Sequence, residues 1–177
     1  MKLVILDRDG VINHDNASYI SSTDDWQPLP GSLEAIAKLT QAGYHVVVAT
    51  NQSAIGRGLL EMATLNAIHD KMHRAVVQAG GRIDAVFYCP HGQEDDCRCR
   101  KPKAGLLEEI SRRFNTDLKD VSSIGDALRD LQAAAAAGAQ PVLVLTGKGE
   151  ETRRSSELPA GTRIYADLAA AAKSIIK

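Results

Sequence analysis

Five short, mostly apolar runs alternate with longer stretches whose apolar residues recur at helical spacing, and this alternation constrains the fold most strongly. The runs have the length of strands and lack the regular polar alternation of a sheet with one solvated face. They cover residues 2–7, 44–50, 83–89, 121–126 and 141–146. Continuous apolar strands that alternate with helices are typical of parallel sheets covered on both faces. We therefore predict an α/β fold with a doubly wound, mostly parallel sheet.

Helices are predicted between these strands and after the last one, over residues 32–42, 62–79, 127–137 and 167–176. The first follows a Pro-Gly pair, and the second and third stop at glycines, which commonly end helices. The stretch 147–157, GKGEETRRSSE, is expected to be a solvated surface loop. A length of 177 residues suits one domain with a substantial core, and no repeat or linker divides it. We expect a single domain over residues 1–177.

Composition argues against several classes of protein. The formal net charge of -1 offers no basic excess for binding nucleic acid. No apolar run approaches the roughly 20 residues that span a bilayer, and the N-terminus lacks the features of a signal peptide. The three cysteines are an odd number, which disfavours a disulfide framework. We expect a cytoplasmic monomer with reduced thiols and without a nucleic-acid or membrane partner.

Polar side chains follow four of the predicted strands, at the edge where parallel α/β sheets bind ligands. The groups are Asp7-Arg8-Asp9-Gly10, Thr50-Asn51, Lys101 (reached through a cysteine-rich loop), and Gly125-Asp126 with Asp130 four residues later. Taken singly, each has an ordinary explanation, such as a turn, a helix start or an exposed lysine. An EF-hand is excluded because its further oxygen ligands are missing. Together, the carboxylates, hydroxyl, amide and cation predict a site for a phosphate group and Mg²⁺.

These motifs, in this order along the whole chain, resemble those of the haloacid dehalogenase superfamily of phosphatases. DRDG, Thr50, Lys101 and GDALRD match the four motifs of that superfamily. The resemblance implies a covalent mechanism in which Asp7 attacks phosphorus and forms an aspartyl-phosphate. Asp9 would protonate the leaving alcohol and would then activate water as a base.

The resemblance also implies a set of ligands. Mg²⁺ would be held by Asp7, the backbone carbonyl of Asp9 and Asp126, with Asp130 behind them. The phosphoryl oxygens would be bound by Thr50, Asn51 and Lys101. The two-residue spacing of Asp7 and Asp9 places both side chains on one face of an ideal strand and Arg8 on the other.

All three cysteines fall within residues 89–99, together with a histidine. Cys89, His91, Cys97 and Cys99 provide three thiolates and one imidazole, a set that suits tetrahedral Zn²⁺. Four protein ligands would leave no open position, so we predict a structural metal that stiffens the loop before Arg100 and Lys101. Iron in place of zinc stays open as an alternative, as does a reduced loop without metal.

This loop, ending in CRKP, and TNQSAIGRG at residues 50–58 are similar to one branch of the superfamily. That branch holds heptose 1,7-bisphosphate phosphatases and histidinol-phosphate phosphatases. The resemblance implies a phosphatase without a cap domain that removes the 7-phosphate of the heptose, a phosphosugar precursor of lipopolysaccharide. Substrate contacts would come from three loops on the rim of the site, around residues 10–20, 51–59 and 90–103, and from residues that include Gln52, Ser53, Arg57 and Arg100.

Two substrates therefore remain in view, and different features favour them. NQSAIGRG is close to the form found in heptose enzymes, whereas the short interval from His91 to Cys97 favours histidinol phosphate. Ala127 stands where heptose enzymes often carry lysine. A binding module without turnover would not need Asp9, and a mutase would need a cap that excludes water.

Two further features of the sequence are assigned no role in the chemistry. His69 and His73 lie one turn apart on a predicted helix and are expected on its exposed face. Trp26 is expected to pack the loop that follows the first strand.

Overall fold

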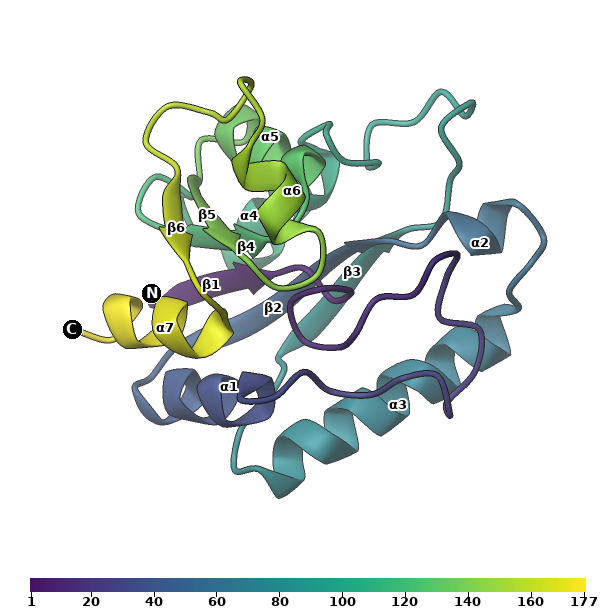
Figure 1. Cartoon of the computed structure of the whole chain (residues 1–177), viewed down its shortest axis with the longest axis horizontal. Helices are drawn as coiled ribbons and strands as arrows, with labels where there is room; N and C mark the ends of the chain where they lie inside the picture. The colour runs from purple at the N-terminus through teal and green to yellow at the C-terminus, as the bar shows by residue number, and fades with distance from the viewer.

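The computed structural model describes residues 1–177, and its sheet has six strands, all parallel, in the order β3-β2-β1-β4-β5-β6 (Figure 1). The strands are β1 (Leu3–Leu6), β2 (His45–Asn51), β3 (Ala85–Cys89), β4 (Ser122–Gly125), β5 (Gln140–Val144) and β6 (Arg163–Tyr165). The predicted parallel sheet is confirmed. The strand order reverses beside β1, so the crevice for a ligand is expected where β1 and β4 end.

The four predicted helices are confirmed, and three more are present. The helices are α1 (Ser32–Gln41), α2 (Ser53–Gly56), α3 (Met62–Gln78), α4 (Gly105–Phe114), α5 (Leu128–Ala136), α6 (Gly149–Arg153) and α7 (Leu168–Ile175). The prediction of a surface loop over 147–157 is wrong at α6. This short helix has Glu150 and Glu151 in its first turn and Arg153 in its last turn, which suits the helix dipole.

The sheet separates two apolar cores. The residues of β1 alternate between them, because successive side chains of a strand point to opposite faces. Val4 and Leu6 pack with residues of α1, α3 and α7, and Leu3 and Ile5 pack with residues of α4 and α5. Figure 1 shows α1, α3 and α7 below the sheet and α4 and α5 above it. This alternation decides which way the side chains after β1 point.

The segment between β1 and α1 is a long loop that runs over α3 (Figure 1). Trp26 is fully buried in the lower core, as expected. Lys71 of α3 donates to the backbone oxygens of Thr23 and Trp26, at 2.6 and 2.7 Å. The loop is thereby tied to α3. None of the connections contains an additional domain, and none of the helices has the length and apolar character needed to cross a membrane.

Candidate active site

A buried lysine bridges two carboxylates at the end of the first strand. Lys101 Nζ lies 2.9 Å from Asp130 Oδ1 and 3.3 Å from Asp7 Oδ1. Asp130 Oδ2 accepts the backbone N–H of Ala127 at 3.0 Å, so both of its oxygens are engaged inside the protein. Burial would lower the pKa of Lys101, but the charges of Asp130 and Asp7 raise it instead. The lysine is therefore a permanent cation beside Asp7.

Asp126 faces Asp7 from the end of β4. It is only 2% exposed, and its Oδ2 accepts the backbone N–H of Lys148 at 2.8 Å. Gly10 has a φ of 82°, and a Cβ at this position would overlap the Asp126 carboxylate. Only glycine therefore lets the turn after β1 come this close to Asp126.

The buried carboxylates of Asp7, Asp126 and Asp130 repel one another when ionised, and a further cation would stabilise them. Burial and the charge of Asp130 raise the pKa of Asp7 to about 7. Burial and the charge of Asp7 raise the pKa of Asp126 to about 8. Carboxylate oxygens of Asp7, Asp126 and Asp130 lie within 4.8 Å of one another. A set of hard oxygen donors with excess negative charge fits Mg²⁺, which would favour the ionised forms.

Asp9 lies on the same rim, with one of its oxygens more firmly held than the other. Its Oδ1 accepts hydrogen bonds from Arg8 Nε at 2.8 Å and Asn13 Nδ2 at 3.0 Å. Its Oδ2 accepts a longer one, of 3.3 Å, from Gln52 Nε2. Burial would raise the pKa of Asp9, but the charge of Arg8 and these hydrogen bonds lower it. Asp9 and Asp7 line the same cavity, as expected from their spacing.

Arg8 points away from that cavity, toward α3. It is fully buried, and its Nη1 lies 3.1 Å from His69 Nε2. The expectation that His69 lies on an exposed helix face is wrong: it is 9% exposed and faces Arg8, whereas His73 is half-buried. Burial, with the charge of Arg8, lowers the pKa of His69 to about 4. The alternation of β1 placed Arg8 on this side, but nothing in the sequence indicated its partner.

The end of β2 supplies the next part of the cavity. Thr50 is buried, and its hydroxyl accepts a hydrogen bond from Gln52 Nε2 at 3.0 Å. Asn51 is paired with the backbone of Lys101: its Oδ1 accepts the N–H at 3.0 Å, and its Nδ2 donates to the oxygen at 3.2 Å. Ser53 begins α2 and lines the cavity. Asn51 thus holds the loop that carries Lys101.

Two adjoining cavities lie along this rim. The first, of about 300 Å³, contains Asp7, Asp9, Asp126 and Asp130, together with the end of β2. The second, of about 440 Å³, adds Arg57 and shares Ser53 and Arg100 with the first. The loop around residues 10–20 lines the first cavity as predicted, but sequence reasoning singled out none of its lining residues, which include Asp15, Asn16, Ser18 and Tyr19, and it missed Arg129. They lie on loops and a helix turn, where no spacing rule indicates the direction of a side chain.

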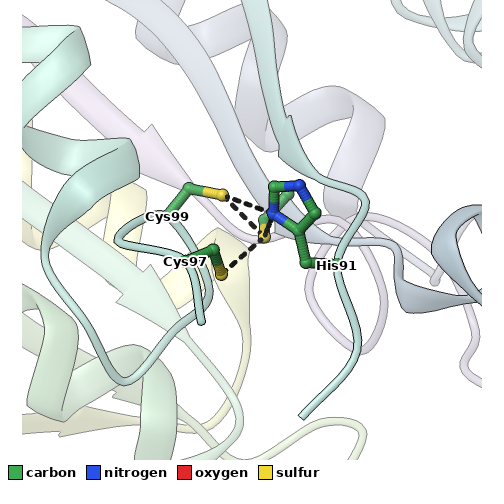
Figure 2. A group of neighbouring side chains, drawn as sticks. His91, Cys97 and Cys99 are labelled. Carbon is green, nitrogen blue, oxygen red and sulfur yellow. Dashed lines mark hydrogen bonds between the residues drawn. The ribbon is translucent and has the colours of Figure 1, made fainter. Parts of the chain in front are cut away.

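The cysteine loop forms a compact cluster beside the second cavity, and Figure 2 shows His91, Cys97 and Cys99 converging. His91 Nδ1 lies 3.5 Å from Cys89 Sγ and 3.3 Å from Cys99 Sγ. Cys89 Sγ lies 3.8 Å from Cys97 Sγ and 2.8 Å from Cys99 Sγ. Zn–S bonds of about 2.3 Å imply sulfurs about 3.8 Å apart in a tetrahedron, so Cys97 fits as placed and Cys99 needs a small side-chain rotation.

The loop is joined to the rest of the rim by hydrogen bonds on both sides of the cluster. Gln52 donates its backbone N–H to Cys89 O, and Gly56 donates its own to Pro90 O, both at 2.8 Å. Arg100 Nη1 donates to His91 O at 3.3 Å. The cluster therefore connects α2 to the segment that carries Arg100 and Lys101.

A parallel α/β sheet with buried carboxylates and a lysine at its switch point defines a class of protein, the metal-dependent enzymes of phosphoryl transfer. A family model described as "HAD-hyrolase-like" matches residues 98–171. The chain is 58% identical over 177 residues to D-glycero-beta-D-manno-heptose-1,7-bisphosphate 7-phosphatase of Bordetella bronchiseptica, covering 100% of this chain and 99% of the relative. It is 51% identical over 176 residues to the enzyme of the same name from Pseudomonas putida, covering 99% and 100%.

Solved structures agree with these relatives. The crystal structure of D,D-heptose 1,7-bisphosphate phosphatase from B. bronchiseptica, complexed with magnesium and phosphate, is 58% identical with a TM-score of 0.98, covering 99% of this chain and 98% of that one. The corresponding enzyme from Burkholderia thailandensis is 54% identical with a TM-score of 0.81, covering 100% and 99%. This chain belongs to the haloacid dehalogenase superfamily and, within it, to the family of heptose bisphosphate phosphatases.

Proposed function

We propose that this protein is a Mg²⁺-dependent phosphatase that removes the 7-phosphate of D-glycero-β-D-manno-heptose 1,7-bisphosphate. The observation that carries the proposal is similarity of 50–58% identity over almost the whole chain to relatives named for this reaction. The β anomer is chosen because those names specify it. The buried Asp7–Lys101 pair in a polar cavity provides the chemistry that such a reaction needs.

The reaction would begin with Asp7 as the nucleophile. Its carboxylate forms a bond to phosphorus while the bond from phosphorus to the sugar oxygen breaks. The negative charge of the bound phosphate would raise the pKa of Asp9 from its lowered value in the free protein, so that Asp9 is protonated before this step. Asp9 gives that proton to the sugar oxygen, which leaves as the alcohol. Lys101 and the Thr50 hydroxyl would stabilise the phosphoryl oxygens as charge develops on them.

In the second half, water attacks the aspartyl-phosphate and gives its proton to Asp9. The bond between phosphorus and Asp7 breaks, and inorganic phosphate is released with both carboxyl groups restored to their starting states. The metal would be held by Asp7, Asp126 and the backbone carbonyl of Asp9, and it would neutralise charge on the phosphoryl group. Asp130 orients Lys101, since both of its oxygens are engaged within the protein.

The second cavity supports recognition of a substrate with two anionic ends. Arg57 and Arg100 line it, whereas Asp7 lines only the first. With the 7-phosphate at Asp7, the 1-phosphate would bind these guanidinium groups, which suit phosphate oxygens well. Gln52, Ser53 and Arg129 line the first cavity and would contact the sugar. Asn51 would contribute through its hold on Lys101.

We also propose structural Zn²⁺ at Cys89, His91, Cys97 and Cys99, with iron as the alternative metal. The closed set of four ligands supports a role in stiffening the loop and none in the chemical steps.

The protein is further proposed to act in the cytoplasm as a monomer, in the synthesis of lipopolysaccharide precursors.

A phosphate-release assay with Mg²⁺ tests the proposed substrate. The β and α anomers of the heptose bisphosphate are compared with histidinol phosphate at equal concentrations. We expect both bisphosphates to have a higher kcat/KM than histidinol phosphate, because only a bisphosphate places anions in both cavities. The β anomer should exceed the α anomer, because the names of the relatives specify β. A preference for histidinol phosphate would overturn the proposal and would assign more weight to the short interval between His91 and Cys97.

A further inference from the structure

The side chain of Arg8 is a buried cation with few partners. It has no exposed surface, and only two of its three nitrogens have hydrogen-bond partners in the chain: Nε binds Asp9 Oδ1, and Nη1 binds His69 Nε2. A buried guanidinium is stable only where its partners are well placed. The two contacts therefore determine where the guanidinium plane lies, and the loss of one would leave that plane free to turn about the other.

His69 is built to accept from Arg8. Arginine has no acceptor and stays charged, so Nε2 of His69 must present its lone pair, which places the ring proton on Nδ1. Ile68 and Met72, on the same helix, are fully buried in the core under the sheet, so the helix that carries His69 is anchored there. His69 is thus a neutral acceptor on a helix that is packed against the lower core.

The chain of contacts ends on the carboxylate that transfers protons in the proposed mechanism. Arg8 and Asn13 both bind Asp9 Oδ1, while Oδ2 has only the longer contact with Gln52. Holding Oδ1 from behind leaves Oδ2 as the oxygen that can turn toward a leaving group in the cavity.

We propose that His69 is a positioning residue for acid catalysis: it holds Arg8, and Arg8 orients Asp9 so that Oδ2 meets the leaving oxygen. The inference rests on the proposed function of Asp9 as the general acid. In the step concerned, Asp7 bonds to phosphorus, the bond from phosphorus to the leaving oxygen breaks, and the proton of Asp9 moves to that oxygen. Arg8 stays cationic and His69 stays neutral throughout, so no proton passes through either of them.

The test compares two substrates of nearly the same shape, phenyl phosphate and p-nitrophenyl phosphate. The p-nitrophenolate is a stable anion that leaves with little help, whereas the phenolate depends more on a proton from the acid. The parameter measured is kcat/KM, which reports on the steps through release of the phenol and not on the later attack of water. A misplaced acid therefore changes the ratio of the two values, and a general loss of folded enzyme does not.

The variants are His69→Leu, which removes the acceptor, His69→Gln, which restores one, and His73→Leu, a matched control on the same helix. For His69→Leu we expect kcat/KM for phenyl phosphate to fall about tenfold, part of the range attributed to general acids, with a clearly smaller fall for p-nitrophenyl phosphate. His69→Gln should recover most of the loss. His73→Leu should keep the ratio of the unaltered enzyme.

Equal losses on both substrates, or none, would overturn the positioning function and leave His69 as a packing residue. Asp9→Asn separates this failure from failure of the proposed function: without a strong bias against phenyl phosphate in that variant, Asp9 is not the acid. If His69→Leu does not fold, Arg8→Lys is measured in the same way. Its ammonium lacks the planar fork with which the guanidinium fixes both contacts, so the same bias is expected, and its absence would contradict the inference.

Discussion

Two regions of the rim differ in how the protein holds the side chains proposed as metal ligands. The carboxylates of Asp7, Asp126 and Asp130 lie at strand ends or in the first turn of a helix and are almost completely buried. The cysteine cluster begins at Cys89, the last residue of β3, and its other three ligands lie in the loop beyond the sheet, where their side chains are half-buried. In the first region the fold itself fixes the geometry. In the second, the ligands must fix one another, and this is the situation in which a structural metal contributes most.

Lys101 joins the two regions, because it follows the cysteine loop in the chain but lies among the carboxylates in space. Its Nζ contacts Asp7 and Asp130, and its backbone is held by Asn51. Order in the loop therefore affects the chemistry through one residue. This difference leads to an expectation: changes in the carboxylate region should abolish turnover, and changes in the cysteine loop should weaken it by way of stability.

The largest effect is expected for Asp7→Asn. An amide cannot attack phosphorus, so kcat should fall about 10⁴-fold or more, as for the loss of other catalytic nucleophiles. Circular dichroism and thermal unfolding should show an intact fold, because the change removes one of several crowded negative charges. Phosphate release at a near-normal rate would contradict the covalent mechanism.

Lys101→Met comes next and tests the link between the two regions. Its loss leaves Asp7 and Asp130 buried without their shared cation, so we expect kcat to fall about 10²–10³-fold. Unfolding in urea should show a loss of about 3–5 kcal/mol, as for other broken buried pairs. Lys103→Met is the control, since Lys103 is exposed and contacts only the oxygen of Cys97. Similar kinetics for the two variants would mean that the burial of Lys101 has no catalytic consequence.

Cys97→Ala probes the loop alone. We expect the purified protein to contain about one zinc per chain and the variant to lose it, since three ligands remain of four. The melting temperature should fall, and activity should fall by about tenfold, because Arg100 and Lys101 lose their fixed support. Metal analysis by mass spectrometry is compared with kinetics on the same samples. A variant that keeps its metal and loses only activity would contradict a structural function.

The same contrast explains how much could be predicted from the sequence. Five strands could be predicted because they are buried apolar runs. Asp7, Thr50 and Asp126 could be predicted as functional residues because they lie at the ends of those runs. Strand β6 was missed because it has only three residues, Arg163–Tyr165, of which the first two are exposed. Helix α4 was missed although Leu106, Leu107 and Ile110 form a buried stripe on it, because no capping side chain marks where it begins after the cysteine loop.

The neighbours of Arg8 were beyond prediction for a different reason. Its direction followed from strand alternation, yet its partner His69 is 61 positions away on a helix. Helical spacing indicates which residues share a face, and His69 lies only one position from the buried Ile68. Whether such a residue at the edge of the apolar stripe is exposed or buried depends on what packs above it. Here that is a buried cation.

The smallest effect concerns pH and separates the two regions without any mutation. The folded-state pKa values of Asp7 and Asp126 are raised, to about 7 and about 8, so the metal-free protein binds protons more tightly than its unfolded chain. Their contribution to stability is present below the usual carboxyl pKa and is lost as pH rises through these folded values. The melting temperature of Mg²⁺-free protein should therefore fall by a few degrees between pH 6 and 9.

Adding Mg²⁺ should reverse that fall, with a larger stabilisation at pH 9 than at pH 6, because the ion binds the ionised carboxylates. Asp126→Asn serves as the control, since it removes both a titrating group and a proposed metal ligand. It should reduce both the pH dependence of the melting temperature and the stabilisation by Mg²⁺. Zinc in the cysteine cluster should be unaffected by this treatment. If stability instead rose with pH in the absence of Mg²⁺, the carboxylates would already be paired within the protein, and the rim would have no need of a divalent cation.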